Sequence, residues 1–239
     1  MKPGLSSCHL TQYVSVVAVV AVIAALALPA VPAFAQVAPS AAQAAAYSGL
    51  LAAAQRGDVE LAKALLAKKA PLEARDASRR TALHVATFAR QRDVIRLLAT
   101  AGADLNALEY QRYDPVTIAA VANDEETLAL LLQLGASAKN ITSPYDGTAL
   151  IAAAHLGHVG VVQQLIAAGA PLDHINNLHW TALIEAVVLG DGGPRHTEIV
   201  RLLLAAGANP ALGDRDGNTP LALAKARGYK EMVRWLSRH

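Results

Sequence analysis

Residues 146–170 read DGTALIAAAHLGHVGVVQQLIAAGA, and this stretch contains the signals that determine the fold of the chain. It opens with the turn dipeptide Asp-Gly, and the side chain of Thr148 is placed to cap a short helix. Gly157 then allows the chain to reverse, because a left-handed conformation costs glycine little. Apolar residues three and four apart in 161–166 predict the buried stripe of a second, antiparallel helix.

The phrase that starts the first of these helices returns along the chain at nearly fixed spacing. From a faint copy at Ser48, the steps between successive copies are 33, 33, 34, 33 and 38 residues. The five clear copies are Thr81-Ala82-Leu83-His84, Asp114-Pro115-Val116-Thr117, Thr148-Ala149-Leu150-Ile151, Thr181-Ala182-Leu183-Ile184 and Thr219-Pro220-Leu221-Ala222. Self-similarity at this period predicts a stacked repeat array, in which neighbouring repeats share one core.

Three phrases show which kind of repeat this is: Gly157-His158, Gly102-Ala103-Asp104 and Asp216-Gly217-Asn218-Thr219-Pro220-Leu221. Together they resemble the ankyrin repeat, and the resemblance covers about Tyr47 to His239. It implies an all-α solenoid of about six repeats, each a helix-turn-helix with a hairpin finger, stacked into a curved slab with a concave groove. We expect repeats near residues 47–75, 76–108, 109–142, 143–175, 176–213 and 214–239.

Several residues depart from the repeat pattern. Arg90 and Asn123 replace the glycine between the two helices, and Lys69 replaces the closing glycine of the first copy. Arg90 predicts local strain or a rearranged turn, because its side chain disfavours a left-handed conformation. The inserted residues 191–195 predict a longer loop on the rim opposite the fingers.

The N-terminus has the layout of a secretory signal peptide. Lys2 precedes an apolar run from Val14 to Leu28, and Ala33-Phe34-Ala35 provides a small-x-small site. We therefore predict a signal peptide over residues 1–35, cleavage after Ala35 and a periplasmic or secreted protein of bacterial type, followed by a flexible linker over 36–46. An uncleaved membrane anchor over 13–35 is the alternative, although Pro29 and Pro32 oppose a continuous helix.

Charge and motif content argue against several functions. Removing Lys2 from the 21 basic residues leaves 20 against 19 acidic ones, which does not favour nucleic-acid binding. The single cysteine, Cys8, lies in the predicted signal peptide, and the pair His155 and His158 lacks a convincing third metal ligand. No catalytic or nucleotide-binding motif is recognisable. We expect no enzymatic activity, no cofactor, no bound metal and no stable membrane insertion after cleavage.

Aromatic residues gather where the resemblance places the finger tips and the groove. Of the eight aromatic residues after Ala35, five fall in this set. The predicted partner-binding residues are Arg80, Phe88, Tyr110, Tyr113, Tyr145, His155, Leu178 and Trp180. Tyr and Trp are enriched among binding hot spots, although packing between fingers could also account for them.

The resemblance favours a non-enzymatic, monomeric protein-interaction scaffold that acts in the periplasm. Residues 97–200 contain three basic and eleven acidic side chains, and both flanking regions are basic. We therefore expect the partner to be another exported protein with a basic, partly apolar surface. A self-assembling structural element and a secreted, host-directed effector are the alternatives.

Overall fold

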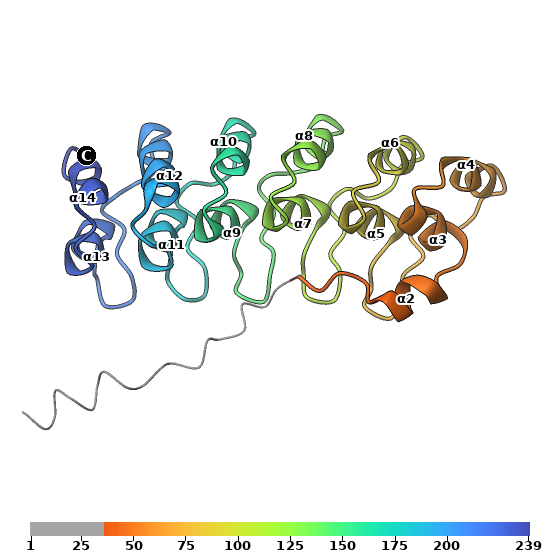
Figure 1. Ribbon diagram of the computed structural model, residues 1–239, viewed down its shortest axis with the longest axis horizontal. Coiled ribbons are helices and arrows are strands. Elements are labelled where there is room, and N and C mark those ends of the chain that lie inside the picture. Colours follow the sequence, from red (N-terminus) through yellow and green to blue (C-terminus); the bar gives the residue numbers. More distant parts are fainter. Residues whose placement is uncertain (1–35) are drawn as a thin grey trace, which may run out of the picture. The chain divides into compact units, whose positions relative to one another are not determined.

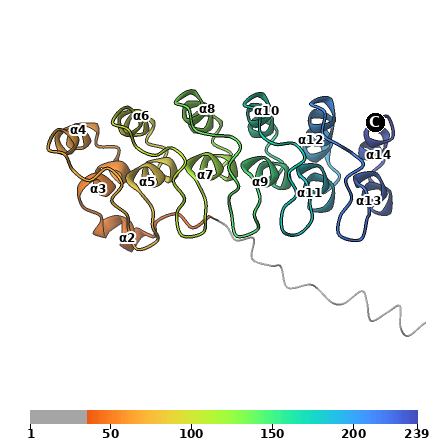
Figure 2. The ribbon, with the colours of Figure 1, turned by 180° about the vertical axis from the view of Figure 1, so that it is seen from behind.

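Thirteen helices form the regular structure of residues 36–239, the part of the chain that this computed structural model describes. Twelve of them make six antiparallel pairs in a row, with the first helices in one layer and the second helices in another (Figures 1 and 2). The pairs are α3 (Gly49–Arg56) and α4 (Val59–Ala67), α5 (Ala82–Phe88) and α6 (Arg92–Thr100), α7 (Pro115–Val121) and α8 (Glu125–Gln133), α9 (Ala149–Leu156) and α10 (Val159–Ala167), α11 (Ala182–Val188) and α12 (Pro194–Ala205), and α13 (Pro220–Ala226) and α14 (Lys230–Leu236). The predicted all-α repeat solenoid is confirmed.

The recurring phrase starts the first helix of each repeat as predicted. The side chains of Thr81, Asp114, Thr148, Thr181 and Thr219 each accept a hydrogen bond from a backbone N–H in the first turn. His84 adds a contact between repeats, because its Nε2 lies 3.3 Å from the carbonyl oxygen of Tyr113. Burial lowers the pKa of His84 to about 4, so the ring is neutral at physiological pH and acts as a structural residue.

The chain reverses between the helices of a pair through one left-handed residue. Gly57 and Gly157 have φ of 70° and 73°, and Arg90 and Asn123 take the same conformation with φ of 56° and 49°. The turn at Arg90 is therefore preserved rather than rearranged. Its guanidinium donates to the carbonyl oxygen of Ala122 and lies 3.5 Å from the Asp124 carboxylate, so these contacts with the next repeat offset part of the backbone cost.

The core is one continuous strip shared by all six repeats, from Leu50 in α3 to Leu236 in α14. Buried alanines on the first helices let adjacent pairs approach closely; they are Ala52, Ala53, Ala54, Ala82, Ala86, Ala119, Ala120, Ala149, Ala153, Ala154, Ala182, Ala186 and Ala224. Larger apolar residues of the second helices, such as Leu98, Leu131 and Leu165, fill the space behind them. No repeat buries its apolar face alone.

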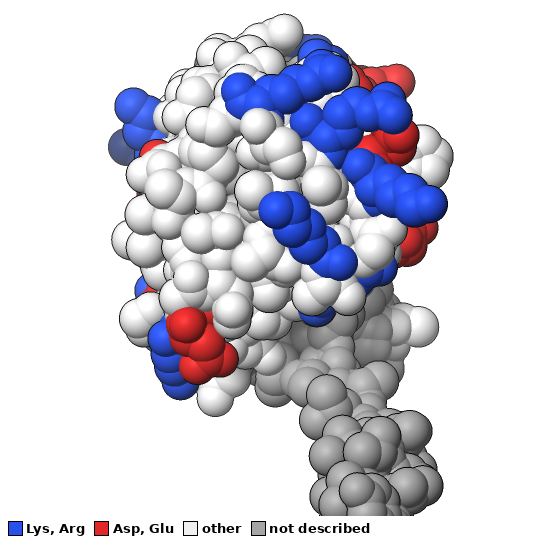
Figure 3. Space-filling model, turned by 90° about the vertical axis from the view of Figure 1, so that its left-hand side faces the viewer, with Lys and Arg blue, Asp and Glu red and all other residues white. Residues whose placement is uncertain are grey.

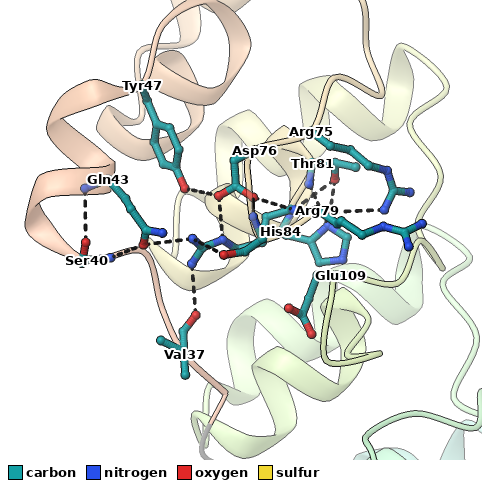
Figure 4. Close-up of polar contacts among 12 residues, drawn as sticks. Val37, Ser40, Gln43, Tyr47, Arg75, Asp76, Arg79, Thr81, His84 and Glu109 are labelled. Atoms are coloured by element: carbon teal, nitrogen blue, oxygen red, sulfur yellow. Dashed lines mark hydrogen bonds and ion pairs between the residues drawn. The ribbon is translucent and has the colours of Figure 1, made fainter.

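The prediction that residues 36–46 form a flexible linker is wrong, because this segment is bound to the repeat array. Residues Ala41–Ala46 form helix α2, which starts with a reciprocal capping box between Ser40 and Gln43. The buried guanidinium of Arg80 donates to the Val37 carbonyl oxygen at 3.0 Å and to Gln43 Oε1 at 3.1 Å (Figure 4). We call residues 36–46 the N-terminal strap.

The carboxylate of Asp76 also takes part in the contact between Arg80 and the strap. Asp76 Oδ2 accepts hydrogen bonds from Arg80 Nε at 2.8 Å and from the Tyr47 hydroxyl at 2.6 Å (Figure 4). Burial opposes the ionisation of Asp76, but the hydrogen bonds from Tyr47 and Arg80 outweigh it and lower the pKa of Asp76. The strap is thus held by a charged pair that is itself removed from water.

The insertion at residues 191–195 lengthens a helix as well as a loop. Helix α12 has twelve residues, against nine in α10, and Pro194 occupies its first turn. Asp191 Oδ1 lies 2.8 Å from the Gly193 nitrogen and 3.0 Å from His196 Nδ1, and the Tyr229 hydroxyl donates to Gly190. The insertion is therefore anchored to the last repeat.

The C-terminal end of the row, formed by α13 and α14, presents many cationic side chains (Figure 3). The exposed cations of these two helices and the residues that flank them are Lys225, Arg227, Lys230, Arg234 and Arg238. Arg234 pairs with Glu231, and Arg238 lies over the ring of Trp235. This polar face terminates the array, while Met232 and Leu236 pack inward.

Replacing Arg80 with alanine should strongly destabilise the first two repeats, by about 3 to 5 kcal/mol, because Asp76 would be left without its buried partner. Urea unfolding and hydrogen exchange of the α3 amides would measure the loss. The exposed Arg96 of α6 is the control, and Arg96→Ala should change stability by less than about 0.5 kcal/mol. Equal stability of the two variants would contradict the role assigned to Arg80.

Candidate binding surface

Each finger is a tight loop organised by one polar side chain at its start. Asp76, Glu109, Asn176 and Asp214 each use one side-chain oxygen to accept two backbone N–H groups two and four residues further on. In the intervening finger, the Ser143 hydroxyl accepts from the corresponding pair of amides. Every finger thus has the same internal frame, which holds its tip in a defined position.

Neighbouring fingers are also joined to one another. The Tyr110 nitrogen donates to the Ser78 carbonyl at 2.9 Å, and the Asn177 nitrogen donates to the Tyr145 carbonyl at 2.9 Å. An ion pair of 2.7 Å links Arg112 with Asp146 in the next finger. The fingers therefore form a row that is joined by hydrogen bonds and an ion pair.

Six of the eight predicted partner-binding residues are accessible to different degrees. Tyr110 is 74% exposed and Leu178 is 41% exposed, so both present apolar surface at finger tips. Phe88, Tyr145, His155 and Trp180 are half-buried. The array brings Tyr110, Tyr145, Leu178 and Trp180 onto successive fingers, whereas Phe88 and His155 lie near the ends of the first helices α5 and α9.

The other two predicted residues are buried, which contradicts a direct role in binding. Arg80 is 1% exposed because its guanidinium is enclosed by Asp76, Ser78 and the N-terminal strap. Tyr113 is 6% exposed, and burial raises the pKa of its hydroxyl to about 12. The spacing in the repeat placed both residues near a finger, but it could not show that their side chains turn inward.

Sequence reasoning missed two exposed apolar residues in the finger segments, Ile141 and Ile175. Alignment of the repeats offers a signal for Ile175, because Arg75, Leu108, Thr142 and Gly213 occupy its position in the other fingers. Because the side chain at this position differs in every finger, it is not needed for the hydrogen-bonded loop that all fingers share.

A buried carboxylate that sequence reasoning also missed lies beside this surface. The Glu185 side chain on α11 is 5% exposed, and its Oε1 accepts a hydrogen bond from Asn176 Nδ2 at 3.0 Å. Burial raises the pKa of Glu185 to about 7, and the bond from Asn176 offsets only part of this effect. His155 Nδ1 is 3.8 Å from Glu185 Oε2, which is too long for a hydrogen bond.

Two histidines at the starts of second helices contact backbone carbonyl groups: His158 is the N-cap residue of α10, and His196 lies in the first turn of α12. His158 Nδ1 lies 3.0 Å from the Ala120 oxygen, and His196 Nε2 lies 3.0 Å from the His155 oxygen. Within residues 36–239, no three His, Cys, Asp or Glu side chains are grouped so that they could hold a metal ion. Both histidines therefore join adjacent repeats.

Over the same residues, no helix has the length and apolar character needed to span a membrane. The predicted signal peptide, residues 1–35, and its cleavage site lie outside the described part of the chain.

Comparison with known proteins identifies relatives along most of the chain. A family model described as ankyrin repeats (3 copies) matches residues 28–109 and 116–214, and a second model for ankyrin repeats (many copies) matches residues 194–236. The ankyrin repeat protein YahD of Escherichia coli (strain K12) is 35% identical over 187 residues, which cover 78% of this chain and 92% of YahD.

Solved structures agree with these matches. An ankyrin repeat domain from Acinetobacter baumannii AYE is 46% identical with a TM-score of 0.75, and the match covers 79% of this chain and 96% of that domain. The ankyrin repeat protein EF0377 is 30% identical with a TM-score of 0.72, and the match covers 81% of this chain and 99% of that protein.

Replacing Glu185 with glutamine should change how stability depends on pH. Because the folded state raises the pKa of Glu185 from 4.5 to about 7, the folded protein binds a proton more tightly than the unfolded chain, and wild type loses stability as pH rises between these values. Glutamine does not titrate, so the variant does not lose stability in this way. The free energy of unfolding of the variant minus that of wild type should therefore increase by about 3 kcal/mol from pH 4.5 to pH 8. Urea unfolding across this range would measure it, and parallel curves for the two proteins would contradict it.

Proposed function

Since the chain belongs to the ankyrin repeat family, whose repeats are protein–protein interaction modules, we propose that it is a non-enzymatic scaffold for another exported protein. In this proposal the protein acts as a monomer in the periplasm. It contacts its partner through the finger tips and the adjacent ends of the first helices.

The observation that carries this proposal is the position of the exposed large apolar side chains. Four of the six among the described residues lie in finger segments: Tyr110, Ile141, Ile175 and Leu178. Water-exposed apolar groups on a connected, preorganised frame are suited to binding, because little conformational freedom is lost when a partner covers them.

Backbone strain at the finger tips supports the same surface. Arg79, Arg112, Asp146 and His179 occupy one equivalent tip position with φ between 51° and 65°, whereas Gly217 takes it in the last finger. A left-handed conformation costs a non-glycine residue about 1 kcal/mol or more. Four side chains are retained where glycine would be less strained, as expected if they are used for recognition.

The charge of the central repeats indicates the chemistry of the partner. Residues 97–200 contain eleven acidic and three basic side chains, and the exposed apolar finger residues all fall within this segment. We therefore propose a partner whose contact surface is basic and partly apolar, because opposite charges steer association and set the register of an interface.

We further propose that residues 1–35 are a signal peptide, on the strength of their cationic start, apolar run and small-x-small site. Cleavage after Ala35 would leave the N-terminal strap intact, since the Arg80 contacts begin at Val37. Export and the folding of the first repeats are thus compatible.

Export can be tested by the mass of the protein recovered from the periplasmic fraction. We expect the mature chain to begin at Gln36, because Ala35 is the last residue of the small-x-small site. Replacement of Ala33 and Ala35 by arginine should block processing and leave the precursor at the membrane. A full-length chain found in the cytosol would refute this part of the proposal.

A triple substitution, Tyr110→Ala, Leu178→Ala and Trp180→Ala, tests the binding surface. The variant should fold, and its affinity for a partner captured from periplasmic extract should fall at least a hundredfold, about 3 kcal/mol, because hot spots of this kind dominate interfaces. The affinity of the purified pair would be measured by calorimetry.

The control carries Arg96→Ala, Gln133→Ala and Gln163→Ala, three exposed positions on second helices, and should bind like wild type. Equal loss in both variants, or in neither, would show that the fingers are not the binding surface. Capture of a second copy of the chain in place of another protein would favour self-assembly instead.

A further inference from the structure

Glu185 departs from the repeat pattern at a position that is otherwise aliphatic. Four residues after the helix cap, the other five repeats have Ala52, Val85, Ile118, Ala152 and Leu223. Burial of a carboxylate in place of such a side chain is costly, because water stabilises the charge better than the protein interior does. Packing of the solenoid therefore does not account for Glu185.

A second departure in the same repeat matches the first. The residue that organises the finger is a carboxylate in three fingers (Asp76, Glu109 and Asp214) and a hydroxyl in one (Ser143), but it is the amide Asn176 in the finger next to Glu185. Asn176 keeps the organising role through Oδ1, which accepts from the Leu178 and Trp180 nitrogens at 3.0 Å. Its Nδ2 is then free to hold Glu185 Oε1, whereas a carboxylate at this position would repel Glu185.

The second oxygen of Glu185 is left without a hydrogen bond among the described residues. Oε2 is buried and has no hydrogen-bond partner. Its nearest ionisable neighbour is His155, whose side chain is 38% exposed and whose pKa is lowered by burial and by the charge of His196. A partly exposed imidazole thus lies 3.8 Å from a buried carboxylate oxygen that has no hydrogen-bond donor among the described residues.

We propose that Glu185 is the anchor of a subsite that binds one arginine side chain of the partner protein, with Oε2 as the acceptor and His155 as the side chain that moves aside to admit it. The proposal rests on the proposed function and names the chemistry that the fingers recognise. A guanidinium suits the site because it presents planar N–H donors and loses hydration more readily than an ammonium group.

Two features of the neighbouring residues support arginine binding at this subsite. Asn176 fixes both the carboxylate and the backbone of the finger that contains Leu178 and Trp180, so an arginine bound at Glu185 would lie beside the apolar finger surface. The acidic character of residues 97–200 favours the approach of a cation. The smallest motif of the partner that this surface would recognise is one arginine with an apolar group next to it.

The test uses Nα-acetyl-arginine N-methylamide as the probe and Nα-acetyl-citrulline N-methylamide as its neutral isostere. Titrations of the purified protein would be followed through the NMR signals of the Leu178 and Trp180 amides and the Asn176 side-chain amide. We expect saturable shifts with the arginine probe and affinity at least tenfold weaker with citrulline. Glu185→Gln should abolish the arginine response, and urea unfolding would verify that it is folded.

Two further variants make the result specific. Glu125→Gln removes the same charge from an exposed carboxylate of the second helix α8, away from the fingers, and should bind the arginine probe like wild type. His155→Ala uncovers Oε2 and should bind it as tightly as wild type or tighter. Equal losses in Glu185→Gln and Glu125→Gln, loss in His155→Ala alone, or no saturable shift in wild type would each overturn the subsite.

Failure of the subsite is distinguishable from failure of the proposed function. If Glu185→Gln keeps full affinity for the captured partner while the triple finger variant loses it, the scaffold proposal stands and the arginine subsite is wrong. If the finger variant keeps its affinity, the binding surface itself is misplaced, whatever the arginine probe does.

Discussion

The whole structure depends on one constraint, which is that each helix pair must bury its apolar face against its neighbours. Alanines on the first helices, such as Ala86 and Ala153, set the distance between repeats, and leucines of the second helices close the core behind them. This constraint fixes the orientation of every pair and therefore places the fingers in one row. The insertion before α12 is tolerated because it lies at a turn, outside the shared strip.

Much of the fold could be predicted because its signals are local. A capping Thr or Asp, a turn residue with positive φ and an apolar stripe all act within a few residues, and the structure confirms Thr148 and Gly157 in these roles. The N-terminal strap could not be predicted in this way. Its contact joins Val37 to Arg80 across 43 residues, and the Ala-rich sequence between Ser40 and Tyr47 carries no apolar pattern that would indicate docking.

The candidate site was less predictable than the fold for a related reason. Position in the repeat correctly identified exposed residues such as Tyr110 and Leu178, but it could not determine the direction of the Arg80 and Tyr113 side chains. That direction depends on packing between repeats. Glu185 is different, because the repeats must be aligned with one another before it can be recognised as a carboxylate at an otherwise aliphatic position. In a repeat protein, each copy serves as an internal reference for the others, and matched departures such as Asn176 and Glu185 deserve more weight than isolated ones.

The charges at the two ends of the array have a consequence for filament formation. The first repeat exposes Arg56, Lys68 and Lys69 as well as Lys63, which pairs with Glu60, and the last repeat exposes the cationic face of α13 and α14. A solenoid is open at both ends, so head-to-tail contact between copies could in principle extend it without limit. Here such contact would join two surfaces of the same charge and remove both from water. Like charges at the two ends therefore oppose head-to-tail contact between copies.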